Sequence, residues 1–370
     1  MTPLRVGFDT GPLYGPKTGI GLAVQALHDS LEQRDDIELV DYLVSARARP
    51  PATTHKFPVP AAFAHRCWAH SSHPRADRWL GGAQLVHGTN YVVPPSRLPR
   101  LVTVYDCWFL RQPAHVQPAV HRAGQVLRRA VSAGAMVHTS SVATERAVRE
   151  LLPNAVVRTV HLGPLTLPAP PATAPLGLDG APFILALGTI ERRKNLPLLV
   201  AAFGAVAAQH ADVRLVLAGG EDDDAAAVHR AVDALGPTLA ARVTFTGRVD
   251  DPARSWLLHH AAVLAYPSLD EGFGFPLLDA MQAGVPVVAS TAGSIPEVAG
   301  DAALLSAPDD GDALAANLEL ALTSQSVRDH LVATGAQQWR RFSWQRCAQE
   351  MVALYHDVVA GRVDESEGST

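Results

Sequence analysis

The sequence predicts an α/β protein built from two doubly wound domains, each with a parallel sheet. Short apolar runs alternate with amphipathic helical patterns along the chain, which is typical of parallel sheets flanked by helices. The 370 residues are too many for one ordinary core and suit two domains of similar size. Residues 166–181 are rich in proline, alanine and glycine without periodicity, which predicts an interdomain linker.

The first half, residues 1–165, has the element order of a doubly wound domain. Its apolar runs predict strands over residues 4–8, 84–87, 101–105 and 137–139. Amphipathic spacing predicts helices over residues 19–33, 118–133 and 141–151. We expect Ser140 to cap the last of these helices, because a serine hydroxyl can accept a hydrogen bond from a free backbone N–H.

The same pattern restarts after the linker and continues over residues 182–341. Apolar runs predict strands over residues 183–187, 213–218, 243–245, 262–266 and 286–289. A helix is predicted over residues 196–209, between the first two of these strands. Residues 342–361 contain a last helical pattern, and residues 362–370 form a polar tail that we expect to be flexible.

The composition is that of a soluble globular protein. Hydrophobic residues make up 48% of the chain and charged residues 18%, which excludes a disordered protein. No run of about 18 apolar residues predicts a membrane span, and the N-terminus has no apolar segment long enough for a signal peptide. The three cysteines are widely spaced, which fits free thiols in a reducing cytoplasm and offers no metal-binding pattern.

The net charge of −5 conceals a difference between the two halves. Residues 1–165 hold 18 of the 31 lysines and arginines and 11 of the 36 acidic residues, so the first half is basic and the second acidic. A basic first half suggests an anionic partner, although two merely solvated surfaces would give the same counts. Nucleic acid is excluded as that partner, because the arginines are dispersed and not interleaved with aromatic residues.

The segment YPSLDEGFGFPLLD, which ends at Asp279, is the most informative part of the chain. Pro276 suits the start of a helix, and Gly272 and Gly274 let the backbone approach a ligand just before it. The N-terminus of that helix would then face an anion such as a phosphate. Glu271 and Asp279 would repel the phosphate, so we expect them to accept hydrogen bonds from hydroxyls on either side of it. A diphosphate flanked by sugar hydroxyls is a nucleotide sugar.

A second segment, GTIERRKN over residues 188–195, follows the first strand of the second half. It contains Lys194, one of only three lysines in the chain, next to Arg193. Cations at the carboxyl end of a strand could neutralise a diphosphate leaving group without a metal. A solvated helix start would explain the same residues, but the glycine-rich segment in the same half favours the phosphate role.

Two other patterns have simpler explanations. Residues 221–224, EDDD, contain the kind of acidic pair that chelates Mg²⁺, but a solvated loop with helix-capping acids also accounts for them. We therefore expect no catalytic metal. The loop over residues 9–21 has glycines before a helix, as in a dinucleotide site, but Val24 stands where the third glycine belongs. A flexible loop over a ligand is the favoured interpretation.

In the first half, polar residues follow two predicted strands at the edge where ligands bind. These are His87 and Asn90 in the segment VHGTN, and Tyr105 and Asp106 in the segment VYDCW. His87 could equally be a core histidine. Asp106 could be a site residue, because an unpaired buried carboxylate is costly, or it could cap the next turn.

Together these segments resemble the retaining nucleotide-sugar glycosyltransferases of family 4, which have the GT-B fold. The resemblance covers nearly the whole chain and is most specific in the second half. The segments that carry it are TGIG (18–21), VHGTNY (86–91), GTIERRKN (188–195), FTGRV (245–249), EGFGFP (271–276), GSIPEV (293–298) and FSW (342–344). It implies two Rossmann-like domains facing a central cleft, with the acceptor in the first and the donor in the second. It also implies that the helix over residues 342–361 crosses back to the first domain.

The resemblance also implies roles for individual residues. Glu271 matches the acid that contacts the donor sugar and acts in catalysis, with Gly272 and Phe273 beside it. Arg193 and Lys194 match the basic pair that holds the donor diphosphate. The other diphosphate contacts are expected from Gly19, Gly274 and Phe275. The nucleoside is expected to meet Asp279, Arg248 and Val249, where Asp279 is one methylene shorter than the usual glutamate.

One departure from the family concerns the first domain. Many relatives have His-Asp where this chain has Tyr105 and Asp106, the two other expected catalytic residues. A tyrosine is a poor base at neutral pH, because its usual pKa is near 10. The proposed front-face mechanism tolerates this change, since the departing phosphate takes the proton of the acceptor. His87 and Asn90 are the expected acceptor contacts.

The expected reaction transfers a hexose with retention and forms an α-glycosidic bond. GDP-mannose is the first choice of donor, because the GTIERRKN segment resembles that of bacterial mannosyltransferases that build cell-surface polysaccharide. The acceptor would be a saccharide, a lipid-linked sugar or a small molecule. The location would be cytoplasmic, with possible peripheral association at the inner membrane face through Arg122, Arg128 and Arg129.

Four alternatives to this reaction are considered. A UDP-sugar transferase, using glucose or N-acetylglucosamine and a soluble natural-product acceptor, would have the same motifs. A non-catalytic sugar-nucleotide-binding protein would explain Tyr105. A pyridoxal-phosphate phosphorylase shares the fold, but Lys194 is better explained by the diphosphate. An NAD-dependent oxidoreductase is disfavoured by the glycine pattern, so no cofactor is expected.

Overall fold

The computed structural model describes all residues except 1, 16–17, 114–115, 175–177, 179 and 363–370. The chain forms two compact units. Unit 1 consists of Met1–Gly163 and Ser343–Thr370, and unit 2 of Pro164–Phe342. Among the described residues, no helix is both long and apolar enough to span a membrane.

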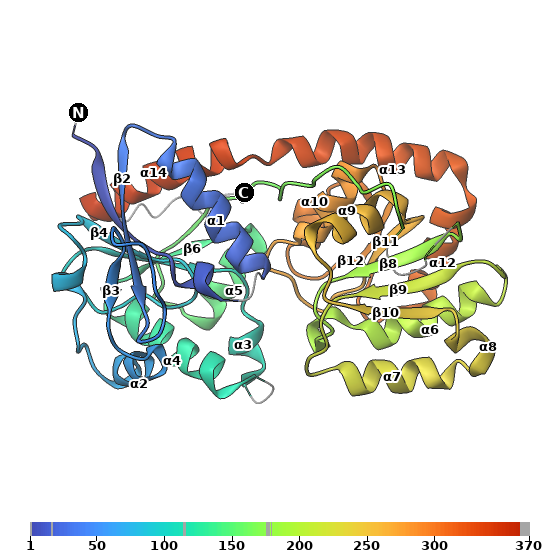
Figure 1. The fold of residues 1–370 in the computed structure, drawn as a ribbon, viewed down its shortest axis with the longest axis horizontal. Coiled ribbons are helices and arrows are strands. Elements are labelled where there is room, and N and C mark those ends of the chain that lie inside the picture. Colours follow the sequence, from blue (N-terminus) through green and yellow to red (C-terminus); the bar gives the residue numbers. More distant parts are fainter. Residues whose placement is uncertain (1, 16–17, 114–115, 175–177, 179, 363–370) are drawn as a thin grey trace. The chain divides into compact units, whose positions relative to one another are not determined.

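Unit 1 contains a seven-stranded sheet in the order β3-β2-β1-β4-β5-β6-β7, and all neighbouring strands are parallel (Figure 1). The strands are β1 (Leu4–Asp9), β2 (Ile37–Val44), β3 (His55–Phe57), β4 (Leu85–Gly88), β5 (Arg100–Val104), β6 (Met136–Thr139) and β7 (Val157–Thr159). The helices are α1 (Gly19–Glu32), α2 (Ala61–His70), α3 (Trp108–Arg111), α4 (Pro118–Ser132), α5 (Val142–Leu151) and α14 (Trp344–Ala360). The central strands are buried on both faces, as expected of a sheet covered by helices.

Helix α14 comes from the end of the chain and completes unit 1. Its Tyr355 and Met351 are fully buried. The Tyr355 hydroxyl lies 2.9 Å from His87 Nδ1 in β4, which joins the last helix to the centre of the sheet. Gly163 packs so closely on Trp344 that a Cβ atom there would lie 2.5 Å from the Trp344 backbone nitrogen.

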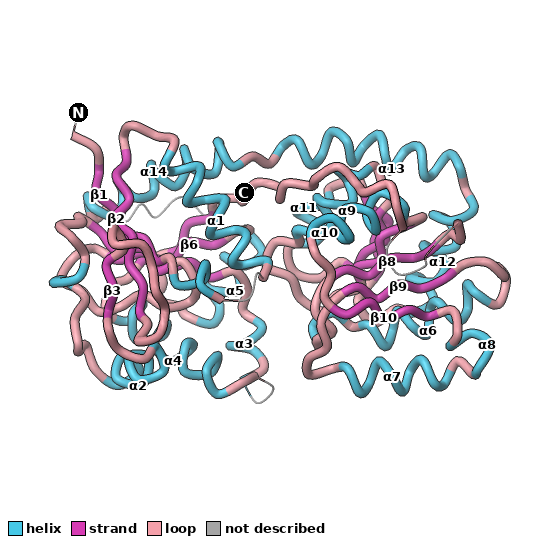
Figure 2. Tube along the Cα trace, in the orientation of Figure 1, coloured by secondary structure: helices cyan, strands magenta, loops and turns pink. Residues whose placement is uncertain are grey.

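Unit 2 contains a six-stranded parallel sheet in the order β10-β9-β8-β11-β12-β13. Figure 2 shows the neighbouring strands β8, β9 and β10 of this sheet. The strands are β8 (Phe183–Leu187), β9 (Arg214–Ala218), β10 (Val243–Gly247), β11 (Val263–Tyr266), β12 (Val287–Ser290) and β13 (Ala303–Ser306). The helices are α6 (Leu196–Ala207), α7 (Ala225–Ala234), α8 (Pro237–Ala240), α9 (Asp251–His260), α10 (Phe275–Ala283), α11 (Ile295–Ala299), α12 (Gly311–Thr323) and α13 (Gln325–Gln338).

The prediction of two doubly wound parallel-sheet domains is confirmed. All nine predicted strands form, and the predicted helices form with ends that differ by up to two residues. The strands that the pattern missed are β2, β3, β7 and β13. Three of them have only three or four residues, and acidic residues interrupt the apolar run of β2. The prediction of the α5 cap was wrong by one residue, because the Ser141 hydroxyl, and not that of Ser140, accepts the Thr144 N–H at 3.1 Å.

The beginning of the stretch predicted as a linker is held against unit 2. The carbonyl oxygens of Leu165, Thr166 and Pro168 accept hydrogen bonds from side chains of α10 and α9. The donors are Gln282, Arg254 and Ser255, respectively. These residues therefore form an ordered strap along unit 2. Residues 363–370, which make up nearly all of the predicted flexible tail, lie outside the described residues.

Candidate active site

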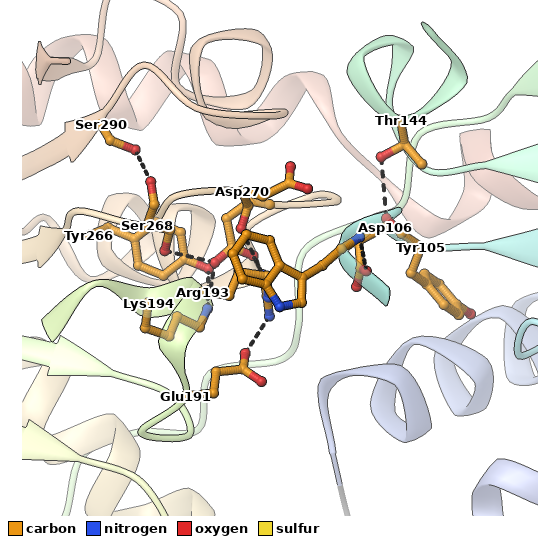
Figure 3. A network of polar contacts seen from close by, with 12 residues as sticks. Tyr105, Asp106, Thr144, Glu191, Arg193, Lys194, Tyr266, Ser268, Asp270 and Ser290 are labelled. Carbon is orange, nitrogen blue, oxygen red and sulfur yellow. Dashed lines mark hydrogen bonds and ion pairs between the residues drawn. The ribbon is translucent and has the colours of Figure 1, made fainter. Parts of the chain in front are cut away.

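In unit 2 the strand order reverses between β8 and β11, and doubly wound folds bind ligands beside the carboxyl ends of strands at such a point. Arg192–Lys194 form a short 3₁₀ turn after β8, and Glu271 lies in the loop after β11. The fold thus brings the predicted cations and the predicted carboxylate to the same edge of the sheet. We call the resulting polar cluster the donor cluster and define it as Glu191, Arg193, Lys194, Tyr266, Ser268 and Glu271. Figure 3 labels all of these residues except Glu271.

Glu271 is the centre of the donor cluster. It is buried, with 5% of its surface exposed, and each of its carboxylate oxygens meets a cation. Lys194 Nζ lies 2.6 Å from Oε1, and an Arg193 guanidinium nitrogen lies 2.5 Å from Oε2. The Ser268 hydroxyl donates a further hydrogen bond to Oε1 at 2.8 Å. The carboxylate is therefore fixed in orientation from both sides.

The two cations are held by further contacts. Lys194 donates to the Tyr266 hydroxyl at 2.8 Å and lies 4.5 Å from the centre of the Tyr266 ring. Arg193 donates to the Asp270 carbonyl at 3.0 Å and to Glu191 Oε1 at 2.6 Å. With both carboxylates ionised, the donor cluster has two positive and two negative charges. Its attraction for a diphosphate would therefore depend on the placement of the charges and on nearby backbone N–H groups, not on a surplus of positive charge.

The charge state of the donor cluster follows from burial and pairing. Burial on its own would raise the pKa of Glu271, but Arg193 and Lys194 hold that pKa at about 2. Burial lowers the pKa of Lys194, and the nearby Glu271 opposes that decrease. Burial also raises the pKa of Tyr266 well above 10, so this phenol remains a neutral hydrogen-bonding partner. At neutral pH Glu271 is ionised and can only accept hydrogen bonds.

The backbone around Glu271 is fixed by close packing. Gly293 has φ of 56°, and a Cβ atom at this position would lie 2.5 Å from the Glu271 backbone nitrogen and oxygen. The Ser294 N–H donates to the Glu271 carbonyl at 3.0 Å. Gly274, with φ of 93°, directly precedes α10 and starts that helix in a conformation that glycine favours. The loop over residues 271–274 therefore ends at the N-terminus of α10, with Phe275 as the first helical residue and Pro276 as the second.

The predicted sugar-binding residues beside Glu271 are themselves buried. Phe273 is 4% exposed, and its ring packs edge-to-face on Phe275 at 5.3 Å and on Phe342 at 5.6 Å. Its side chain serves the interior of unit 2, so a ligand contact from this residue would come from its backbone. Gly272 is also buried.

Asp279 lies in the second turn of α10 and pairs with a residue that the sequence did not point to. Its Oδ2 lies 2.5 Å from Arg254 NH1 of α9, while its Oδ1 is buried and has no hydrogen-bond partner among the described residues. Burial raises the pKa of Asp279 to about 7, although Arg254 acts in the opposite direction. An unpaired buried oxygen of this kind can accept a hydrogen bond from a ligand hydroxyl. Arg254 is also held by the Thr166 carbonyl at 3.1 Å.

The residues predicted at the base-binding edge follow β10. Arg248 is exposed and Val249 half-buried. The Arg248 side chain lies over Gly220, since a Cβ atom on that glycine would be 3.0 Å from Arg248 Nε. Gly220 follows β9, the strand next to β10, so these residues share one edge of the sheet.

In unit 1, Tyr105 and Asp106 follow β5, where Tyr105 is buried and Asp106 is half-buried. Tyr105 is 9% exposed, and burial raises its pKa above 10, which makes it still less suited to act as a base. Asp106 accepts hydrogen bonds on both oxygens, from the Tyr91 hydroxyl at 2.9 Å and from the Trp108 N–H at 3.1 Å. The second bond is the turn cap that the sequence left open as an alternative. Figure 3 shows Tyr105 with the Thr144 hydroxyl donating to its carbonyl.

The acceptor role expected for His87 needs correction. His87 is completely buried, and both of its ring nitrogens have partners, Tyr355 at 2.9 Å and Thr103 at 2.8 Å. It is a core histidine, which was the other interpretation. Asn90 remains at the ligand edge of the sheet, where its Oδ1 is buried without a partner among the described residues. Gly19 is exposed and opens α1 after its cap, Thr18.

The predicted membrane anchors lie on α4. Arg128 and Arg129 are exposed, and Arg122 is half-buried. Arg128 also donates to the Leu151 carbonyl at 3.2 Å. A separate group in unit 1, His28, Asp29 and Glu32, is spaced closely enough to hold a metal ion, and it includes no residue of the donor cluster.

Sequence reasoning found the charged residues of the site but missed their partners. Tyr266 and Ser268 lie in the glycine-rich segment itself, so their nearness to Glu271 in the sequence was the available signal. Tyr91 follows Asn90 directly, and its φ of 57° is unusual for a residue other than glycine. No signal in the sequence pointed to Arg254, which is 25 residues before Asp279.

Comparison with known proteins finds similarity to glycosyltransferases. Residues 181–324 match the family model "Glycosyl transferases group 1". The chain is 28% identical over 387 residues to O-antigen chain mannosyltransferase B of Escherichia coli, which covers 95% of this chain and 99% of that protein. It is 34% identical over 195 residues to a phosphatidyl-myo-inositol mannosyltransferase of Mycolicibacterium smegmatis, over 50% of this chain and 49% of that protein.

The fold also matches solved structures over nearly its full length. Sucrose-phosphate synthase from Thermosynechococcus elongatus aligns with a TM-score of 0.74 and 20% identity, covering 97% of this chain and 100% of that one. WaaG, a glycosyltransferase involved in lipopolysaccharide biosynthesis, aligns with a TM-score of 0.70 and 15% identity, covering 96% and 100%. The chain has the GT-B fold of these structures, and its residues 181–324 are similar to the glycosyl transferases group 1 family.

Proposed function

We propose that this protein transfers mannose from GDP-mannose to a saccharide or lipid-linked acceptor with retention, forming an α-glycosidic bond. The observation that carries the proposal is the donor cluster, in which Arg193 and Lys194 hold Glu271 at the strand-order reversal of unit 2. The mannosyltransferase relatives support the choice of mannose. The base and the stereochemistry follow from the family resemblance of the motifs.

The donor cluster and α10 would bind different parts of the donor. Glu271 is ionised and acceptor-only, so it suits the hydroxyls of the transferred sugar. The free N–H groups and dipole at the N-terminus of α10 suit the diphosphate, as do Arg193 and Lys194. The free Oδ1 of Asp279 suits a ribose hydroxyl. The donor would then be bound on both sides of its diphosphate, at the sugar by Glu271 and at the ribose by Asp279.

Cleavage of the sugar–phosphate bond develops negative charge on the leaving diphosphate. Groups already placed beside that charge stabilise it most, because they need no reorganisation during the reaction. In the proposed front-face mechanism, an oxygen of the leaving phosphate takes the proton of the acceptor hydroxyl. Tyr105 is then not required as a base, in agreement with its raised pKa. No metal is needed in this scheme.

The acceptor is proposed to be a saccharide, free or linked to a lipid diphosphate. The relatives are named for O-antigen and phosphatidyl-inositol mannosylation, which supports an acceptor of this class. The exposed Arg128 and Arg129 on α4 would suit peripheral association with an anionic membrane surface.

The test measures thermal stabilisation by GDP, UDP, dTDP and ADP, with and without EDTA, followed by transfer from the matching sugar nucleotides. Ligand at about 100 times its Kd adds roughly 2.7 kcal/mol to the unfolding free energy, which gives a clear shift. We expect GDP to stand out, EDTA to have no effect, and GDP-mannose to give an α-linked product. Stabilisation by UDP alone would favour the UDP-sugar alternative, and no stabilisation by any nucleotide would contradict the proposal.

A further inference from the structure

A buried carboxylate lies at the strand-order reversal of unit 1 and has no assigned role. Asp9 is the last residue of β1, and the order reverses between β1 and β4, as it does between β8 and β11 in unit 2. The Thr89 hydroxyl, just after β4, donates to the Asp9 carbonyl at 2.7 Å, so the ends of the two strands are joined there. This is the position in unit 1 where a doubly wound fold binds a ligand.

The surroundings of Asp9 do not compensate its charge. One carboxylate oxygen, Oδ1, accepts the Gly11 N–H at 2.8 Å. Among the described residues, no lysine or arginine pairs with Asp9, and no hydrogen bond reaches its Oδ2. Burial raises the pKa of Asp9 to about 7, which the Gly11 hydrogen bond only partly offsets. Asp9 as a whole residue is only half-buried.

Further polar side chains lie at the ends of the neighbouring strands β4 and β5. Asn90 follows β4, and its buried Oδ1 has no partner among the described residues. Asp106 follows β5, the next strand, and each of its carboxylate oxygens accepts one hydrogen bond, from Tyr91 or Trp108, and can accept a second. Tyr105, beside Asp106, is close enough to Asp9 for the two to interact electrostatically. Three neighbouring strands thus end in groups that can hydrogen-bond to hydroxyls: the Asp9 and Asp106 carboxylates accept, and the Asn90 amide can both accept and donate. The two carboxylates would repel a phosphate.

We propose that Asp9 binds the acceptor substrate, with Oδ2 accepting a hydrogen bond from a hydroxyl of a neutral saccharide. Asn90 and Asp106 complete the hydroxyl-binding surface at the ends of β4 and β5. The inference rests on the proposed transferase function and specifies the chemical class of the acceptor substrate. The part of the acceptor bound at the strand ends of unit 1 is an uncharged, hydroxyl-rich sugar. If the acceptor is lipid-linked, its diphosphate lies elsewhere.

The test compares Asp9→Asn with wild type and with Asp35→Asn, a change of an exposed aspartate in the same unit. Asparagine keeps an oxygen to accept the Gly11 N–H, removes the charge and replaces the other acceptor oxygen with an NH₂ donor. Three quantities are measured: thermal stabilisation by GDP, hydrolysis of GDP-mannose without acceptor, and transfer to methyl α-mannoside and α-mannobiose. Mannose 6-phosphate serves as the anionic comparison acceptor.

For Asp9→Asn we expect stabilisation by GDP and donor hydrolysis to equal wild type, since the donor cluster lies in unit 2. Transfer to the neutral mannosides should fall by about 10- to 100-fold, because a hydrogen bond to a charged group is lost. The variant should also melt at a higher temperature than wild type at pH 8, since a buried, uncompensated charge has been removed. A purely structural Asp9 would instead make the variant less stable. Asp35→Asn should match wild type in every measurement.

Several results would overturn the proposal. Transfer by Asp9→Asn within threefold of wild type would exclude acceptor binding by this carboxylate. Parallel loss of melting temperature, hydrolysis and transfer would assign Asp9 a structural role. Wild-type transfer to mannose 6-phosphate but to no neutral saccharide would exclude the neutral acceptor. These outcomes differ from failure of the proposed function, in which wild type would not respond to any nucleotide.

Discussion

Lys194 Nζ lies 2.6 Å from Glu271 Oε1, so the strongest cation candidate and the strongest carboxylate candidate of the site are partners of each other. Arg193 makes the equivalent contact with Oε2 at 2.5 Å. Each group therefore sets the charge and orientation of the others before any donor binds. Such preorganisation favours a reaction in which charge develops on a leaving diphosphate.

Replacing Glu271 with Gln should abolish most transfer while retaining nucleotide binding. The loss of an interaction placed for the transition state costs about 10²- to 10³-fold in rate. The two cations would lose their shared carboxylate and remain available to the diphosphate, so stabilisation by GDP should be equal to or larger than in wild type. The measurements are transfer rate and GDP thermal shift. The control is Glu191→Gln, which removes the outer partner of Arg193, and a Glu271→Gln rate within threefold of wild type would contradict the role.

Gly293→Ala should disturb the Glu271 backbone specifically. A Cβ atom at residue 293 would meet the Glu271 nitrogen and oxygen at 2.5 Å, so this loop would have to move. Gly361→Ala is a matched control, because its φ of 62° is similar but a Cβ atom there meets nothing within 4 Å. Both variants should lose about 1 kcal/mol or more of unfolding free energy from the unfavourable backbone conformation. Transfer activity should fall at least tenfold only in Gly293→Ala, and equal activity in the two variants would count against the packing argument.

Arg254→Met should destabilise unit 2 strongly. It would leave Asp279, which is 2% exposed, without the cation that pairs with it among the described residues. Breaking a buried pair by removing one member costs about 3–5 kcal/mol. Arg346→Met removes one member of an exposed pair with Glu350 and should leave stability nearly unchanged. Urea unfolding monitored by circular dichroism makes the comparison, and similar losses in both variants would disprove the difference.

Tyr355→Phe should weaken the attachment of α14 to unit 1. His138 Nε2 faces the Val160 carbonyl and must donate to it, so its Nδ1 accepts from Thr103. Thr103 then accepts from His87 Nε2, and His87 Nδ1 accepts from the Tyr355 hydroxyl. Removing that hydroxyl leaves a buried acceptor unpaired, at a cost of about 1–3 kcal/mol. Tyr14→Phe, at an exposed tyrosine, is the control in the same unfolding assay and should behave as wild type.

The same chain of hydrogen bonds predicts loss of stability in acid. Burial lowers the pKa of His138 to about 4 and that of His87 well below 6.5. The unfolded chain therefore binds more protons than the folded one between pH 6.5 and about 4. Their contribution is fully present above pH 6.5 and declines as the pH falls, with a slope of up to about 1.4 kcal/mol per pH unit for each histidine. Unfolding free energies measured at pH 7.5, 6 and 5 test this. The exposed His356→Gln should leave the profile unchanged, and a wild-type profile flat from pH 7.5 to 5 would contradict the assignment.

The sequence alone determined the fold class and pointed to Arg193, Lys194 and Glu271 of the donor cluster, but not to Glu191. Alternating apolar and amphipathic runs predict a doubly wound domain, since each element must bury its own apolar face wherever the chain continues. Glycines, a proline and carboxylates at short spacing identified the segment around Glu271 in the same way, because local backbone geometry depends on neighbouring residues. The short strands β3, β7 and β13 escaped prediction, because three or four residues carry too little pattern.

Only the tertiary structure decided which groups meet. Arg254 pairs with Asp279 across two helices, His87 is enclosed by α14 from the far end of the chain, and Asp9 lies beside the end of β4. These contacts join residues 25, 268 and 80 positions apart, and no local pattern reports on them. Strand order sets them: the reversal at β1 and β4, and again at β8 and β11, places distant loops at one edge of each sheet. Burial and pairing together then set the charge of each carboxylate, because both depend on what packs around the group and not only on the residues beside it in the chain.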